Sequence, residues 1–150
     1  METTIVSYLA ARRSRNLIVR AHQELTRRWW RQRAGFEVFA SPLVVEEAGR
    51  GDVAARVRRQ RVPRDLPLLE INDDARTVGR QLLASGPLPA RAEGDAPHIG
   101  VAAVHGMEYL ATWNCRHIAN AWMRPQIEEV IRQLGYEPPV LCTPEELLEE

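Results

Sequence analysis

The sequence contains two cysteines, no lysine and no long apolar run. Cys115 and Cys142 lack the spacing of metal ligands, which excludes a cysteine-bound metal site and favours reduced thiols. No apolar stretch reaches the roughly 20 residues that cross a bilayer, and the amino terminus lacks the features of a signal peptide. We therefore expect a cytoplasmic protein without a membrane partner.

All 20 cationic residues are arginine, and they are unevenly distributed along the chain. Residues 1–64 hold 14 arginines and 6 acidic residues, whereas residues 65–150 hold 6 arginines and 14 acidic residues, so the net charge is zero. Because the guanidinium fork matches phosphate oxygens, the basic half could follow a nucleic-acid backbone. Arginine on solvated helix faces is the alternative, and both interpretations stay open here.

A chain of 150 residues is long enough to bury a core, and we expect a single domain over residues 1–150. Apolar periodicity and turn residues predict helices that alternate with short strands, which is typical of an α/β fold with a parallel sheet. The expected helices cover residues 5–21, 24–33, 42–49, 52–61, 72–84, 95–105 and 125–134, and the expected strands cover 36–40, 66–71, 109–113 and 140–142. The helix over 95–105 has a face of small residues, which we expect to pack closely against the sheet.

Acidic and amide residues stand where α/β folds build their sites, at helix starts and strand ends. Asp95 opens the small-residue helix, Asn114 follows the strand over 109–113, and Glu46 and Glu47 lie on the helix over 42–49. Each also has a purely structural interpretation. Asp95 could be a helix N-cap, Asn114 could close a turn, Glu2 could be a frayed terminus, and one residue of the glutamate pair could face solvent.

Four segments, residues 1–9, 40–47, 94–99 and 110–114, resemble the four motifs of the PIN-domain nucleases, in the branch related to VapC-type toxins. The resemblance covers nearly the whole chain. It implies a three-layer α/β/α fold with a central parallel sheet and Mg²⁺-dependent (or Mn²⁺-dependent) endonuclease activity on single-stranded RNA. It further implies that the protein is the toxin of a type II toxin–antitoxin pair. A cognate antitoxin is then an expected partner, and the resemblance leaves open whether the protein forms a homodimer.

By this resemblance, Glu2, Glu47 and Asp95 hold the metal, which activates the water that hydrolyses the phosphodiester. Asn114 contributes an amide oxygen or a hydrogen bond, and Glu46 is the rival of Glu47. The steering of RNA is expected from arginines near these acids, namely Arg12, Arg13 or Arg116.

The family places a strand before its first acid, whereas Met1 here directly precedes Glu2, so we expect a truncated first strand. A catalytically inactive PIN-like interaction or RNA-binding module is therefore the alternative function. We expect His98 and His105 to be packed or hydrogen-bonded, and His117 to serve at a helix start. Of the adjacent tryptophans Trp29 and Trp30, one should pack inward.

Overall fold

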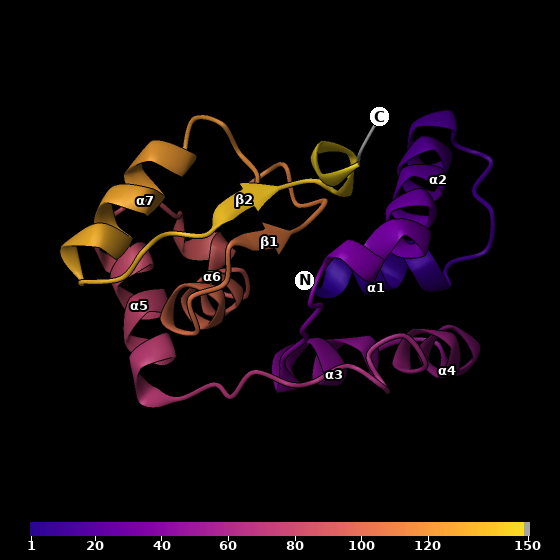
Figure 1. Ribbon diagram of the computed structural model, residues 1–150, viewed down its shortest axis with the longest axis horizontal. Helices are drawn as coiled ribbons and strands as arrows, with labels where there is room; N and C mark the ends of the chain where they lie inside the picture. The colour runs from indigo at the N-terminus through magenta and orange to yellow at the C-terminus, as the bar shows by residue number, and fades with distance from the viewer. Residues whose placement is uncertain (149–150) are drawn as a thin grey trace.

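The computed structural model describes residues 1–148 and has a mixed helical and stranded architecture (Figure 1). The first part of the chain is helical. Its elements are α1 (Thr3–Ala10), α2 (Leu17–Gln32), the 3₁₀ turn η1 (Arg33–Gly35), α3 (Pro42–Ala48) and α4 (Val53–Gln60). The second part contains both strands. Its elements are α5 (Asp73–Ala84), η2 (Ala90–Ala92), α6 (Ala96–Val104), β1 (Tyr109–Ala111), α7 (Arg124–Gln133), β2 (Val140–Cys142) and η3 (Pro144–Leu147).

The sheet of the described residues is parallel and has two strands. β1 pairs with β2 in the register Tyr109 to Val140, Leu110 to Leu141 and Ala111 to Cys142. The strands predicted over 36–40 and 66–71 are reduced to one parallel bridge, between Ala40 and Leu68. The prediction of an α/β fold with parallel pairing is thus confirmed at the level of a mixed helical and stranded protein.

Side-chain caps explain where several predicted helices begin. Ser41 accepts a hydrogen bond from the amide of Val44 at the start of α3, and Asn72 does the same for Ala75 at the start of α5. The helix predicted over 5–21 is wrong, because α1 ends at Ala10 and α2 begins at Leu17. Asn16 caps α2 with its side-chain oxygen, which the helical periodicity alone does not reveal.

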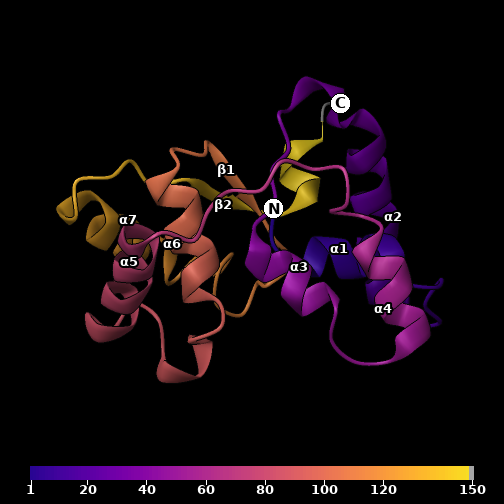
Figure 2. The same cartoon turned by 90° about the horizontal axis from the view of Figure 1, so that it is seen from below.

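The closest approach of the small face of α6 is to α5, at Gly100, whereas Ala102 and Ala103 of the same helix share the large core cluster with Leu110 of β1, as the expected packing on the sheet requires. A Cβ atom added at Gly100 would overlap the carbonyl oxygen of Ala75 and lie 3.2 Å from the nitrogen of Gly79. On the other helix, a Cβ at Gly79 would lie 3.4 Å from the backbone of Ala96. Two glycines therefore allow α5 and α6 to cross at close range, and Figure 2 shows these helices side by side.

The core is divided unequally between the two parts of the chain. The large cluster joins α5, α6, β1, α7 and β2, and includes Leu82, Ile99, Ile118, Ile127 and Leu141. The helices before residue 64 contribute two smaller clusters, one around Val44 and one around Ile5 and Trp29. Of the adjacent tryptophans, Trp29 is buried and Trp30 is partly exposed, as predicted.

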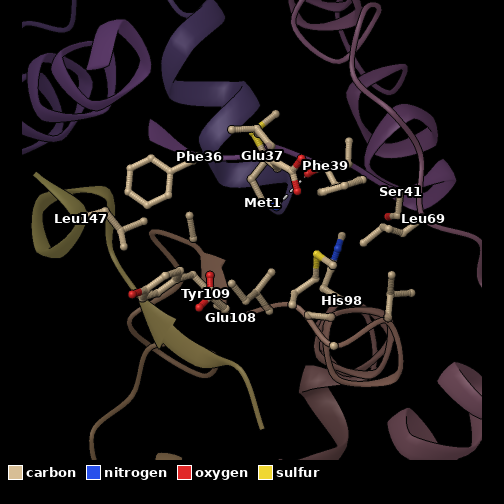
Figure 3. A pocket seen from close by; sticks show the side chains of 18 of the residues that line it. Met1, Phe36, Glu37, Phe39, Ser41, Leu69, His98, Glu108, Tyr109 and Leu147 are labelled. Atoms are coloured by element: carbon tan, nitrogen blue, oxygen red, sulfur yellow. Dashed lines mark hydrogen bonds between the residues drawn. The ribbon is translucent and has the colours of Figure 1, made fainter. Parts of the chain in front are cut away.

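The amino terminus lies in the middle of the molecule, between the two parts of the chain (Figures 1 and 2). The Met1 ammonium donates to the Phe39 carbonyl oxygen at 3.0 Å, and the Glu2 amide donates to the Ala111 carbonyl oxygen at 3.2 Å. Residues 1 and 2 therefore bridge the segment before α3 and the end of β1. A cavity of about 370 Å³ opens beside Met1 (Figure 3). No helix within residues 1–148 is long and apolar enough to span a membrane.

Candidate functional site

Glu2 is a fixed residue and not a frayed end. Its side chain is 4% exposed and occupies the N-cap position of α1, where it accepts hydrogen bonds from the amide of Thr4, at 3.0 Å, and from the Thr4 hydroxyl. The same hydroxyl accepts a hydrogen bond from the amide of Trp113 at 2.8 Å. Thr4 therefore joins the first acid to the segment that follows β1.

Glu47 lies on α3 and faces α1 and α6. One of its oxygens, Oε2, accepts a hydrogen bond from the Thr3 hydroxyl and lies 3.2 Å from Nε2 of the buried His98. Burial raises the pKa of Glu47, but the hydrogen bonds from His98 and Thr3 and the charges of His98 and Arg50 outweigh it and hold the pKa below its usual value. The sequence did not separate Glu47 from Glu46, and the structure places only Glu47 in this network.

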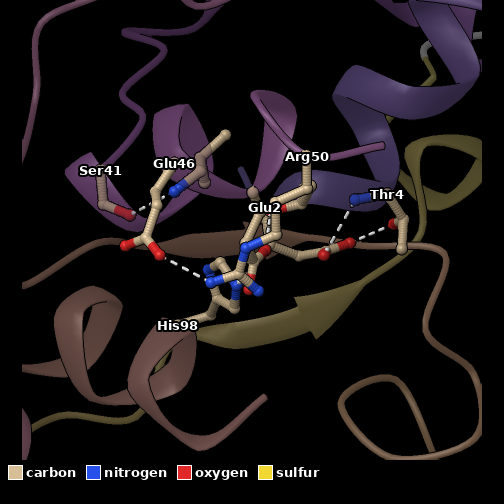
Figure 4. A network of polar contacts seen from close by, with 9 residues as sticks. Glu2, Thr4, Ser41, Glu46, Arg50 and His98 are labelled. Carbon is tan, nitrogen blue, oxygen red and sulfur yellow. Dashed lines mark hydrogen bonds and ion pairs between the residues drawn. The ribbon is translucent and has the colours of Figure 1, made fainter. Parts of the chain in front are cut away.

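Glu46, the neighbour of Glu47 on α3, is exposed and takes no part in the hydrogen bonds of Glu47. It forms an exposed ion pair with Arg50, with 2.6 Å between Oε1 and the guanidinium Nη2, and its side chain is 65% exposed. Figure 4 shows Glu46 and Arg50 together with Glu2, Thr4 and His98. The i, i+4 geometry is typical of a solvated helix face, as expected for one residue of the glutamate pair.

Asp95 stands at the N-cap position of α6 without capping it. Its backbone is already helical and no side-chain cap hydrogen bond forms. The carboxylate instead lies 2.7 Å from Nδ1 of His117, measured to Oδ2. His117 is buried, and its other ring nitrogen, Nε2, has no hydrogen-bond partner within residues 1–148. The interpretation of Asp95 as a simple N-cap is therefore wrong, as is the expectation of a mere helix-start role for His117.

Asn114 closes the turn that follows β1. Its side-chain oxygen accepts a hydrogen bond from the backbone amide of His117 at 3.1 Å, and its backbone amide donates to the Thr112 hydroxyl at 2.8 Å. This turn places the His117 ring beside Asp95. Asn114 thus closes a turn, as one of its two interpretations predicted. Through His117, this turn also connects Asn114 to Asp95.

The structure brings the predicted residues into one region through these contacts. Glu2 and Glu47 are held by the consecutive threonines Thr3 and Thr4, while His98, the partner of Glu47, lies three residues after Asp95 in α6. Three carboxylates suit Mg²⁺ in the chemistry of their oxygen donors. Within residues 1–148, however, no three side chains of the His, Cys, Asp and Glu types lie close enough to hold one ion. Binding one ion would require carboxylates to turn from their present partners.

The sequence did not predict the contacts that four residues make with the acids, namely Thr3, Thr4, His98 and His117. The two histidines were expected to be packed or hydrogen-bonded, or to start a helix, and their pairing with two of the predicted acids was not foreseen. A spacing signal existed for one of them, since His98 follows Asp95 by three residues and so shares its helix face. His105 lies apart from the site, with Nε2 2.8 Å from the Glu70 carbonyl oxygen, as expected for a hydrogen-bonded histidine.

The three arginines expected to steer RNA, Arg12, Arg13 and Arg116, are all exposed. Among residues 1–148, none of the three forms an ion pair with a carboxylate. Their charge therefore remains available to an anionic ligand.

No family model, no curated protein and no solved structure matches this chain. The chemistry of the site therefore rests on its own side chains. Its acids form two carboxylate–histidine pairs, Glu47 with His98 and Asp95 with His117, and the third acid, Glu2, is buried at the start of α1.

Proposed function

We propose that this chain is a metal-dependent endonuclease of single-stranded RNA, with a three-layer PIN-like fold around a central parallel sheet. In this proposal it is the toxin of a toxin–antitoxin pair and is neutralised by a small partner protein. The support comes from the side chains and from the resemblance of four segments to the PIN motifs. The parallel pairing of β1 and β2 is compatible with such a sheet.

The observation that carries the proposal is a series of contacts that connects the surroundings of three acids from distant parts of the chain. Glu2, Glu47 and Asp95 are separated by 45 and 48 positions, yet contacts through Thr3 and His98 link their surroundings. A nuclease site needs hard oxygen ligands that are distant in sequence and near in space.

Glu2, Glu47 and Asp95 are the residues that would hold the ion. Bound Mg²⁺ or Mn²⁺ would neutralise charge on the phosphodiester and lower the pKa of the attacking water. His98 and His117 orient the carboxylates of Glu47 and Asp95, because each ring nitrogen fixes one oxygen and leaves the other free. Asn114 positions the His117 turn, and its side-chain amide would contribute a hydrogen bond to the phosphate.

The exposed arginines Arg12, Arg13 and Arg116 would attract the RNA backbone and supply most of its non-specific affinity. This role predicts that affinity for RNA falls steeply with salt concentration. Cleavage, in contrast, should depend on the acids and the metal.

Cleavage of a labelled single-stranded RNA tests the proposal. With Mg²⁺ or Mn²⁺ we expect cutting that is abolished by EDTA and reduced at least about 100-fold in Asp95→Ala, since the variant loses a metal ligand. Glu93→Ala, which changes an exposed acid two residues away, is the matched control and should cut at the wild-type rate. Circular dichroism of each variant establishes that it is folded. A folded Asp95→Ala protein that still cuts RNA would remove Asp95 from the site.

The second candidate is a PIN-like module that binds RNA or protein without catalysis. The specific observation in its favour is that, within residues 1–148, no three potential ligands lie close enough to hold one ion. This candidate predicts salt-sensitive RNA binding that neither Mg²⁺ nor EDTA changes, and no cleavage by the folded wild-type protein.

A further inference from the structure

Three aromatic side chains meet where α1 and α2 approach the segment that follows β1. Tyr8 belongs to α1, His22 belongs to α2, and Trp113 lies two residues after the end of β1. The rings of His22 and Trp113 are stacked, with 4.0 Å between their centroids and 14° between their planes. Tyr8 stands edge-on to both, with its centroid 5.8 Å from that of His22 and 6.0 Å from that of Trp113. We call these three side chains the ring cluster.

Hydrogen bonds fix the ring of Trp113 in this position. Its Nε1 donates to the hydroxyl of the buried Thr26 at 2.7 Å. That hydroxyl donates to the His22 carbonyl oxygen at 2.6 Å, one helical turn earlier in α2. Thr26 therefore holds the indole against the turn of α2 that carries His22.

The ring cluster is also joined to the first of the proposed metal ligands. The backbone amide of Trp113 donates to the Thr4 hydroxyl at 2.8 Å, and the same hydroxyl contacts the carboxylate of Glu2. Trp113 directly precedes Asn114 in the chain. A ligand on the ring cluster would therefore lie on the side of the candidate site that α1 and the turn after β1 form.

The stack of rings ends at the surface of the protein. Trp113 packs on the apolar cluster around Ile5 and Trp29, and it covers one face of the His22 ring. Within residues 1–148, no second aromatic ring stacks on His22, and its side chain is partly exposed. Tyr8 and Trp113 are partly exposed as well. A further planar ring can therefore extend the stack at His22, as unpaired nucleobases do on aromatic side chains.

Positive charge lies beside the ring cluster, on the loop over residues 11–16 that connects α1 and α2. The buried Gln23, which follows His22, holds this loop by two hydrogen bonds. Its Nε2 donates to the Arg12 carbonyl oxygen at 2.9 Å, and its Oε1 accepts from the Ser14 amide at 3.0 Å.

The side chains of the loop remain free while its backbone is fixed. Its three arginines are exposed, and within residues 1–148 none of them forms an ion pair with a carboxylate: Arg12, Arg13 and Arg15. Guanidinium groups suit phosphate oxygens. Proteins that bind single-stranded nucleic acid combine these two features, cationic groups along the backbone and rings on which bases stack.

We propose that the ring cluster binds one unpaired base of single-stranded RNA, which stacks on His22 while Arg12 and Arg13 contact the phosphates beside it. The identity of this ligand rests on the proposed nuclease function. The site selects single-stranded over double-stranded RNA, because a paired base is stacked inside its own helix and cannot reach a protein ring. Since every base has a planar face, the site accepts all bases.

Binding of a fluorescent oligouridine of about eight nucleotides, measured by anisotropy in EDTA, tests the site without cleavage. His22→Ala should weaken binding about 10-fold through loss of one stacked base, and His22→Phe, which keeps a planar ring, should bind as wild type does. His105→Ala is the matched control, since it removes a partly exposed histidine outside the ring cluster, and should leave the affinity unchanged.

An oligomer of the same length built from abasic ribose units separates base stacking from a general effect on the fold. His22→Ala should bind this oligomer as tightly as wild type does, because its phosphates still meet the arginines. The double variant Arg12→Gln and Arg13→Gln should weaken binding of both oligomers alike. It should also lower the slope of log affinity against log salt by about 1.4, whereas His22→Ala should keep the wild-type slope.

Two results would overturn the proposal. One is equal affinity of wild type and His22→Ala for the oligouridine, and the other is an equal loss of affinity for both oligomers in His22→Ala. Absence of RNA binding by the folded wild-type protein would also overturn it and would leave the ring cluster to a protein partner. Failure of the nuclease proposal is distinct: RNA that binds with this dependence on His22 but is not cut with Mg²⁺ would keep the ring cluster as a base site and refute cleavage.

Discussion

Residues 73–148 pack around one large apolar core, whereas residues 1–64 are joined by small apolar clusters and by arginines that bond to backbone carbonyls. Arg58 Nε donates to the carbonyl oxygen of Ala10 at 3.2 Å, and Arg59 Nε donates to that of Ala48 at 3.1 Å. Ala10 and Ala48 are the last residues of α1 and α3, where free carbonyls and the helix dipole favour cations.

The arginines of this chain therefore have two roles. Some arginines of the first region connect helices in place of apolar contacts. This agrees in part with the alternative that the arginines serve the protein's own structure and not a nucleic acid. Others, including Arg12 and Arg13, are exposed without carboxylate partners within residues 1–148 and remain available for RNA. Total basic charge therefore overstates the charge that a phosphate backbone would meet.

The largest effect on stability is expected where the second region is most closely packed. Gly100→Ala should lower the free energy of unfolding by about 3 kcal/mol, because the added methyl overlaps the Ala75 carbonyl and forces α5 and α6 apart. Gly35→Ala is the matched control in the first region. Its Cβ would have no atom within 4 Å, so its effect should stay within about 0.5 kcal/mol. Urea unfolding measures both, and equal stabilities would refute the close crossing of the helices.

The second effect concerns the junction between the regions, where Met1 is buried. Its amine has a pKa of about 6 in the folded protein and an ordinary value of 8.0. Between these values the unfolded chain binds more protons, so stability falls by roughly 2 kcal/mol as the pH drops from 8 to 6.

Chemical denaturation at a series of pH values measures this slope, and acetylation of the Met1 amine is its control. The acetylated protein cannot take up the proton and should lose that part of the slope. An unchanged slope after acetylation would show that Met1 is exposed in solution.

A smaller effect tests the arginine connections of the first region. Arg58→Ala should destabilise the protein by about 1 kcal/mol, because the carbonyl at the end of α1 loses its donor. Arg61→Ala, which alters an exposed arginine just after α4, should cost less than about 0.5 kcal/mol. Thermal unfolding of the two variants compares them directly. If both were neutral, the first region would be held by its apolar clusters alone.

Local signals predicted the helices better than the strands. Ser41 with Pro42, Asp52 and Asn72 mark helix starts that the structure confirms, because each cap depends on a few neighbouring residues. A strand depends on its partner, which is distant in sequence. Residues 36–40 alternate as a strand does, yet they border the cavity beside Met1, and within residues 1–148 only Ala40 of this segment forms a bridge.

The candidate site was likewise predictable in part. The acids could be named from their positions at helix starts, but the partner of each acid could not be named, because His98 and His117 reach Glu47 and Asp95 only through the packing of α3, α6 and the turn after β1. To choose between Glu47 and Glu46 as the site residue, the direction in which each side chain leaves α3 had to be known.

The most direct test of the proposed site uses that last difference. Single-turnover cleavage of a labelled single-stranded RNA should be compared for Glu47→Gln and Glu46→Gln at saturating Mg²⁺. We expect a rate at least about 100-fold below wild type for Glu47→Gln, whose carboxylate is a proposed metal ligand, and a wild-type rate for Glu46→Gln, whose ion pair with Arg50 is exposed. Equal rates for the two folded variants would contradict it.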